Sequence, residues 1–211
     1  PLVDALKAEM LTYPVLHADE TPVAMLDPGA GKTHRAYLWS YSIGAFEPIK
    51  AVVYDFAESR AGKHAQEFLG DWRGTLVCDD YAGYKALIAK GVTEAGCMAH
   101  ARRKFFDLHV SNQSQITVQA LDYIQQLYRI EQDIADLAPE PRQRRRQEQA
   151  QPILDAFHDW LTRHRRQVPN GSATAKAIDY SLKRWAALIH YVGDGQVPID
   201  NNWIENRIRP I

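Results

Sequence analysis

Three acidic residues stand in polar blocks that could support phosphodiester chemistry. Asp19 lies in the block H-A-D-E-T, Asp79 in D-D-Y-A-G-Y and Glu205 in D-N-N-W-I-E-N. Carboxylates gathered in space bind Mg²⁺, a hard cation that takes oxygen ligands. Two such ions, about 3.5–4 Å apart, activate the attacking oxygen and stabilise the leaving oxygen of a phosphodiester. The three residues therefore predict a site for two-metal phosphoryl transfer.

The neighbours of Asp19 can be assigned to faces of a strand. Successive strand residues point to opposite faces, so Glu20 is expected to point away from the site while His17 shares the face of Asp19. His17 is then either a support for the site or a buried, hydrogen-bonded histidine. We favour the buried histidine.

The residues before Glu205 open a helix. Asn202 with Glu205 three positions later matches a capping box, in which Asn202 would be the N-cap. Asn201 lies one turn before Glu205 and could steady its carboxylate. We therefore expect Asn201 and Asn202, like His17, to be supporting residues.

The elements that must position these acids follow from the apolar pattern. We predict helices over 2–12, 59–70 and 83–90, and strands over 15–19, 36–43, 49–56, 75–79 and 92–97. Short links favour an antiparallel meander of the first three strands, and alternation with helices favours parallel additions. The order predicts an α/β fold with a ribonuclease H-like mixed sheet flanked by helices, in which the Asp79 strand lies beside the Asp19 strand.

A long helical segment separates Asp79 from Glu205. Apolar residues step by four and three along a heptad seam at Ile116, Ala120, Tyr123, Leu127, Ile130, Ile134 and Leu137, a pattern typical of packed helices. We predict a core over 1–110, an all-helical insertion over 111–192, and a C-terminal catalytic helix over 193–211 that completes the core.

Basic residues cluster in three places. His100, Arg102, Arg103 and Lys104 begin a predicted helix, Arg207 and Arg209 follow Glu205, and the densest run is Arg142, Arg144, Arg145 and Arg146. Arginine binds phosphate bidentately, so the first two groups are candidate DNA contacts. The dense run is interpreted as a solvated face, with DNA contact as the alternative. Cys97 and His100 form C-x-x-H, which is half of a zinc site at most, and a buried cysteine is favoured.

Composition limits the class of protein. The 25 basic and 26 acidic residues give a net charge of -1, which argues against a protein that coats DNA by charge alone. Two cysteines in 211 residues favour a reducing cytoplasm over a disulfide framework, and no apolar run is long enough to span a membrane. The chain starts at Pro1, so we expect it to be a piece that lacks its sequence-recognition domains.

Four blocks in order, H-A-D-E-T, D-D-Y-A-G-Y, C-M-A-H-A-R-R-K-F and D-N-N-W-I-E-N-R-I-R-P, resemble the bacterial transposases of the insertion sequence sixty-six family. The resemblance runs from about residue 14 to the C-terminus. It implies a ribonuclease H-like fold with a D-D-E triad, which matches Asp19, Asp79 and Glu205. The family often has Gly where this chain has Asp80, and Asp79 is preferred because it keeps the Y-A-G-Y tail in register.

The same resemblance implies the activity and its partners. These are hydrolysis at transposon ends and strand transfer into target DNA, with two Mg²⁺ or Mn²⁺ ions, double-stranded DNA as partner, no membrane, and a homo-oligomer as a candidate active complex. The expected location is the bacterial cytoplasm, at the nucleoid. Two alternatives stay open, a related two-metal nuclease on the same fold and a non-catalytic DNA-binding remnant of a mobile element.

Overall fold

The structure is a computed structural model that describes residues 1–209, apart from the side chain of Asn112; Pro210, the last residue of the C-terminal block, and Ile211 lie outside the described residues. The chain forms two compact units, Pro1–Glu94 with Asn201–Ile211, and Ala95–Asp200. The second unit is larger than the insertion predicted over 111–192. It gains residues at its start because α4 (Met98–Asn112) packs on α5 (Gln115–Asp133) and α8 (Ala173–Lys183). It also contains residues 193–200, which were predicted to belong to the C-terminal helix.

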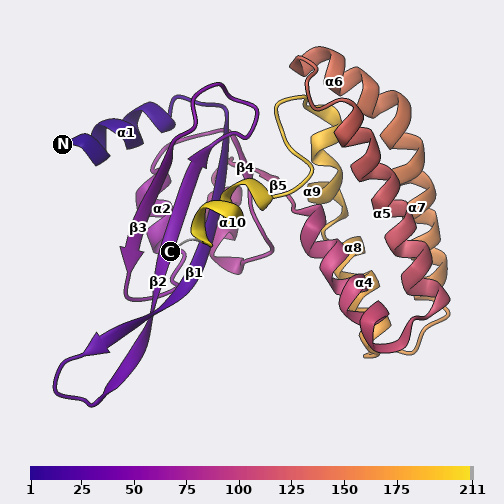
Figure 1. Ribbon diagram of the computed structural model, residues 1–211, viewed down its shortest axis with the longest axis horizontal. Helices are drawn as coiled ribbons and strands as arrows, with labels where there is room; N and C mark the ends of the chain where they lie inside the picture. Colours follow the sequence, from indigo (N-terminus) through magenta and orange to yellow (C-terminus); the bar gives the residue numbers. More distant parts are fainter. Residues whose placement is uncertain (210–211) are drawn as a thin grey trace. The chain divides into compact units, whose positions relative to one another are not determined.

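The first unit is a five-stranded mixed sheet with helices. Its elements are α1 (Leu2–Met10), β1 (Val15–Asp27), β2 (Lys32–Ile43), β3 (Val52–Ala57), α2 (Lys63–Leu69), β4 (Thr75–Val77), η1 (Ala82–Tyr84), α3 (Lys85–Ala89), β5 (Thr93–Ala95) and α10 (Asn202–Ile208) (Figure 1). The strand order is β3-β2-β1-β4-β5. β1, β2 and β3 form an antiparallel meander, and β4 is parallel to β1. The predicted α/β fold, with the Asp79 strand beside the Asp19 strand, is confirmed.

Side chains alternate between the two faces of the sheet, so one face carries core residues and the other carries the candidate site. Leu16 and Ala18 of β1 share one face of the sheet with Trp39 and Tyr41 of β2, and all four are buried. The Tyr41 ring stacks on Phe68 of α2, with 3.7 Å between ring centroids. Asp19 and His17 point to the opposite face because side chains alternate along a strand. α10 packs on β1 and β2.

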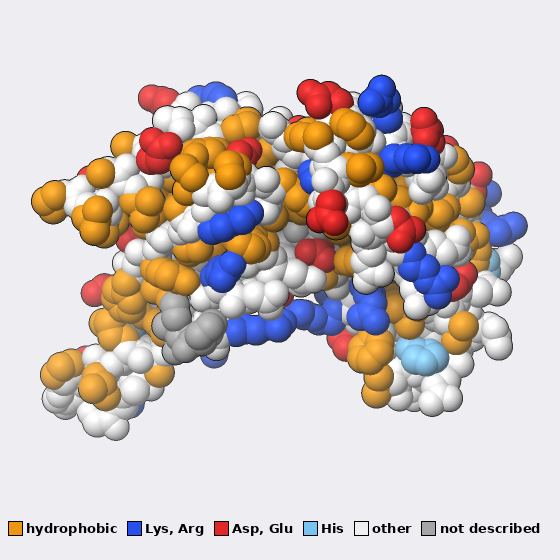
Figure 2. All heavy atoms as spheres, turned by 45° about the horizontal axis from the view of Figure 1, so that its top comes forward, with side chains coloured by type: hydrophobic (Ala, Val, Ile, Leu, Met, Phe, Trp, Pro, Cys, Tyr) orange, Lys and Arg blue, Asp and Glu red, His pale blue; other side chains and the backbone are white. Residues whose placement is uncertain are grey.

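β1 and β2 are much longer than predicted. The sequence suggested strands over 15–19 and 36–43, but pairing continues to Asp27 opposite Lys32. β4 pairs with β1 only as far as His17, so β1 has an open edge where Pro22, which lacks an N–H, is tolerated. We call residues 21–36 the hairpin arm. It extends beyond the other strands (Figure 1), and its tip exposes hydrophobic side chains at the lower left of Figure 2.

The second unit is helical, as predicted. Besides α4, α5 and α8 it contains α6 (Pro139–Arg145), η2 (Arg146–Ala150), α7 (Gln151–Arg165), α9 (Trp185–Ile189) and η3 (His190–Gly193). Ser114 and Ser172 cap α5 and α8, since each side chain accepts a backbone N–H three residues later. The seam residues Leu127, Ile130 and Ile134 are buried, and described residues within 111–192 form no strand.

Two arginines of the dense basic run are buried, which corrects the interpretation of that run as a solvated or DNA-binding face. Arg146 is 0% exposed and donates from Nε and Nη2 to Glu131 at 2.9 and 2.6 Å. Its Nη1 donates to three backbone carbonyls between residues 191 and 197. Arg142 donates to the carbonyls of Gly195 and Leu137. Arg144 and Arg145 are exposed.

The ends of the helical unit are joined by hydrogen bonds. The Met98 N–H donates to the Ile199 carbonyl at 3.1 Å, and the Gly96 N–H donates to the Ala187 carbonyl at 2.9 Å. The chain therefore leaves this unit beside the point where it entered.

None of the helices within residues 1–209 combines the length and the apolar character needed to cross a membrane.

Candidate active site

Asp19 and Asp79 are placed together by the pairing of β1 with β4. The last paired residues of these parallel strands are His17 and Val77, and each aspartate lies two positions further on. Equal offsets along adjacent parallel strands put side chains on the same face. By the same register Asp80 aligns with Glu20. Asp19 was predicted at the end of its strand; it lies instead in the middle of β1, beyond the end of β4.

The electrostatics of Asp19 bring in the third acid. The pKa of Asp19 is raised to about 7, first by burial and then by the negative charges of Glu20, Glu205 and Asp79. Burial disfavours the charged form, and nearby carboxylates add repulsion. The charges of Asp79 and Glu205 therefore both act on Asp19 within the first unit. A divalent cation would remove this repulsion.

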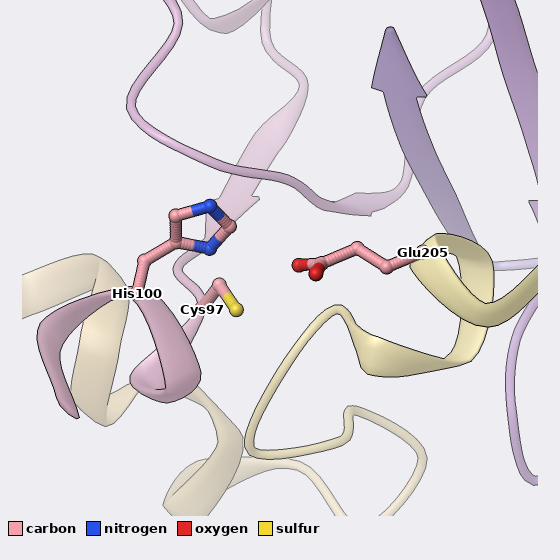
Figure 3. A group of neighbouring side chains, drawn as sticks. All are labelled: Cys97, His100 and Glu205. Carbon is pink, nitrogen blue, oxygen red and sulfur yellow. The ribbon is translucent and has the colours of Figure 1, made fainter. Parts of the chain in front are cut away.

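Glu205 is the fourth residue of α10, and its side chain projects from that helix (Figure 3). Its backbone N–H donates to the carbonyl of Asn201 at 3.3 Å. α10 begins at Asn202, and Asn201 is the N-cap residue. The prediction of Asn202 as the N-cap of a capping box is therefore wrong: the N-cap is Asn201, and its side chain makes no cap hydrogen bond.

Asn201 ties this helix to β1. Its Oδ1 accepts from Nδ1 of His17 at 2.7 Å, and its Nδ2 donates to the Ala18 carbonyl at 2.9 Å. Both side chains are buried. Burial lowers the pKa of His17 to about 4, although the hydrogen bond that His17 donates to Asn201 opposes the shift. His17 is thus neutral with its proton on Nδ1, and two of the three residues that were expected to support the site, His17 and Asn201, contact each other.

An aromatic ring flanked by cations lies on α10. The Arg207 guanidinium and Lys50 Nζ stand over the Trp203 ring at 4.2 and 4.9 Å from its centroid. Arg209, which directly follows this helix as its C-cap residue, is exposed. Arg207 and Arg209 were candidate DNA contacts from the sequence, whereas Lys50 was missed because it lies in the loop before β3 with no pattern around it.

The other candidate DNA contacts lie on α4 of the helical unit. Arg102, Arg103 and Lys104 are exposed there. Cys97, which is buried as expected, and His100 come from the start of α4 (Figure 3). No further ligand from the described residues of the helical unit joins these two. That unit by itself offers half of the four ligands of a structural zinc site.

Glu20 faces away from Asp19, as predicted, and it makes hydrogen bonds of its own. Its buried carboxylate accepts a hydrogen bond from the Tyr84 hydroxyl at 2.7 Å and one from Arg60 Nε at 2.9 Å. Sequence reasoning missed both partners. The one available signal was the second tyrosine of the D-D-Y-A-G-Y block.

Sheet order and strand directions define the first unit as a ribonuclease H-like α/β core with gathered carboxylates. The family model described as "Transposase IS66 family" matches residues 1–211, and the chain belongs to this family. Uncharacterized proteins of Sinorhizobium fredii are similar. One, y4qI, is 35% identical over 92% of this chain and 38% of its own length, and another, y4jD, is 32% identical over 100% and 43%. The chain thus spans about two fifths of these relatives.

Proposed function

We propose that this chain is the catalytic domain of a DNA transposase that hydrolyses phosphodiesters at transposon ends and transfers the freed strand to target DNA. The observation that carries the proposal is the common register of Asp19 and Asp79 on adjacent parallel strands, with the charge of Glu205 acting on Asp19. Membership of a transposase family supports DNA as the substrate.

The donor set fits two Mg²⁺ or Mn²⁺ ions. Asp19, Asp79 and Glu205 offer only oxygen ligands, which suit hard cations, and the raised pKa of Asp19 reflects burial and repulsion that a cation would offset. When bound, the ions would activate the attacking oxygen and stabilise the leaving oxygen. The carboxylates would hold them, and the pairing of β1 with β4 would orient two of the three ligands before substrate arrives.

Cleavage of a duplex that carries the ends of the element, with Mn²⁺ present, tests this proposal. Replacing Asp19, Asp79 or Glu205 by Ala should lower the rate by about 10³-fold, because each change removes several kcal/mol of charge stabilisation. DNA affinity should stay near the parental value, since phosphate contacts come mainly from Arg and Lys. Asp80→Ala is the matched control, because Asp80 pairs with Lys85 at 3.8 Å and has a side chain that is 45% exposed.

The outcomes separate the rival functions. Cleavage without strand transfer would favour a related nuclease, and DNA binding without cleavage by the parent would favour a non-catalytic remnant. An inactive Asp80→Ala variant beside an active Asp79→Ala variant would overturn the assignment of the second aspartate.

A further inference from the structure

A buried carboxylate lies next to the proposed site on the other face of the sheet. The Glu20 side chain is 1% exposed. Its Oε1 accepts from Nε of Arg60, and Nη2 of the same guanidinium donates to the same oxygen. Its Oε2 accepts from the Tyr84 hydroxyl. The Glu20 carboxylate is buried but the Arg60 side chain is 43% exposed, and an ion pair of this kind adds little net stability. The main effect of these contacts is therefore to fix the orientation of Arg60 and Tyr84.

The partners of Glu20 come from two different loops. Arg60 lies between β3 and α2, and Tyr84 closes the turn that follows β4. The Arg60 guanidinium also stands over the Tyr81 ring at 4.0 Å from its centroid. The Tyr81 hydroxyl donates back to the Arg60 carbonyl. The loop after β3 is thus joined to the loop after β4 through the guanidinium and through the backbone carbonyl of Arg60.

Two glycines allow the loops to come this close. A Cβ added to Gly62 would lie 2.7 Å from Cα of Gly83, a backbone contact that real Cβ atoms do not make. A Cβ added to Gly83 would collide with the Tyr81 ring. Gly62 follows Arg60 by two residues, and Gly83 belongs to the D-D-Y-A-G-Y block. The packing of the two loops is therefore backbone against backbone.

The same loop holds the second aspartate of the proposed triad. The backbone N–H of Tyr81 donates to Oδ1 of Asp79 at 2.9 Å. Tyr81 is itself fixed by Arg60, and Arg60 is fixed by Glu20. A continuous set of contacts therefore runs from Glu20 on β1, through Arg60 and Tyr81, to the carboxylate of Asp79.

We propose that Glu20, Arg60, Tyr81 and Tyr84 form a brace that holds the Asp79 carboxylate in position beside Asp19 and so sets the affinity of the site for divalent cations. The inference rests on the proposed function, because it assigns a role toward the same site. Glu20 is here a positioning residue. It acts through Arg60 and the tyrosines from the face of the sheet opposite Asp19, and it is not itself a metal ligand.

Direct Mn²⁺ binding, followed through the electron paramagnetic resonance signal of free Mn²⁺, tests the brace without requiring DNA. Tyr84→Phe, Glu20→Gln and Arg60→Met should each weaken Mn²⁺ binding roughly 10-fold to 100-fold, the usual effect of losing residues that orient metal ligands. The Mn²⁺ concentration for half-maximal cleavage should rise by the same factor. Arg60→Lys should restore part of the affinity lost in Arg60→Met, because it keeps a cation beside Glu20.

Two control variants isolate the brace from general destabilisation. Tyr191→Phe removes the hydroxyl of another buried tyrosine, one that has no hydrogen-bond partner among the described residues. Glu94→Gln neutralises a largely buried carboxylate that pairs with Lys85 at 3.2 Å. Both controls should bind Mn²⁺ as the parent does. Tyr84→Phe changes one hydroxyl only, so it keeps the test decisive even where Glu20→Gln does not fold.

The outcomes distinguish the brace from the proposed function. A parent that neither binds Mn²⁺ nor cleaves DNA would overturn both. A parent that does both, with folded Tyr84→Phe and Arg60→Met variants of parental Mn²⁺ affinity, would overturn the brace alone. Weaker Mn²⁺ binding in these variants, with melting temperatures and DNA affinity near the parent, supports it.

Discussion

At the scale of single residues, the site is defined by what each carboxylate meets. Asp19 is buried near three other acids, which raises its pKa to about 7. Glu20, its neighbour in sequence, forms an ion pair with Arg60 on the other face of the sheet. Because side chains alternate along β1, the adjacent acids Asp19 and Glu20 lie in different environments. One is left in repulsion with other carboxylates, and the other is paired.

The raised pKa of Asp19 makes a prediction about stability and pH. As pH rises from about 4 to 7, the unfolded chain releases this proton before the folded chain does, so the free energy of unfolding falls. The Asp19→Asn variant has no proton to release at this position, so its free energy of unfolding should not fall for this reason. Without divalent metal it should match the parent near pH 4 and exceed it above pH 7 by on the order of 2–4 kcal/mol. Urea unfolding in EDTA across this range measures the difference, and parallel curves for the two proteins would contradict the prediction.

At the scale of elements, Asn201 fixes α10 against β1. Replacing it by Ala removes two buried hydrogen bonds and leaves the Ala18 carbonyl and the His17 ring without that partner. The expected loss is about 1–3 kcal/mol in the free energy of unfolding, with a fall in cleavage because Glu205 shifts with its helix. Asn206→Ala on the exposed side of α10 is the control and should stay within about 0.5 kcal/mol of the parent.

The buried arginines of the helical unit give a second prediction for elements. Arg146→Met leaves Glu131 without its bidentate partner and removes one donor from each of three carbonyls, of which those of Tyr191 and Asp194 keep a backbone N–H donor. We expect a loss of about 3–5 kcal/mol, typical of breaking a buried ion pair. Arg145→Met, one position earlier and exposed, should change stability by less than about 0.5 kcal/mol. Thermal melting of the two variants decides. Equal melting temperatures would mean that the burial of Arg146 contributes nothing.

The sequence predicted elements better than contacts, for a physical reason. Short connections between strands predict the meander, and the spacing of apolar residues predicts the seam of α5. Asp19 and Asp79 were located because each lies at the end of a predicted strand. The partners of Asn201 lie 183 and 184 positions away, and no local pattern encodes them. Arg146 was misread because a run of charges is usually solvated. The length of β1 was missed, and Pro22 within it is acceptable because β1 has an open edge there.

At the scale of the whole molecule, charge is balanced but unevenly placed. The net charge is -1, while the first unit gathers carboxylates around Asp19 and the exposed side of α4 carries Arg102, Arg103 and Lys104. In the proposed function, Arg102, Arg103 and Lys104 would contact DNA phosphates. Binding should therefore depend on salt even though the chain as a whole is nearly neutral.

Salt dependence tests the DNA contacts that we propose for α4. Arg102→Ala and Arg103→Ala should each lower the slope of log affinity against log salt by about one, the value for one lost phosphate contact. Lys176→Ala, an exposed lysine on α8, serves as the control and should leave the slope unchanged. Fluorescence anisotropy with a labelled duplex between low and moderate salt measures the slopes. Unchanged slopes in both arginine variants would assign these residues to the solvated surface.

The joined ends of the helical unit affect how the site assembles. Bringing Glu205 back to the sheet would otherwise require closing a flexible loop of roughly 100 residues, an entropic cost of about 4 kcal/mol. The bond from Met98 to Ile199 brings the two ends of that excursion together inside the helical unit. Once the helical unit has folded, Glu94 and Asn201 of the first unit are linked by a connection whose two ends already lie close together. We expect mutations that melt the helices to weaken metal binding although they touch no ligand.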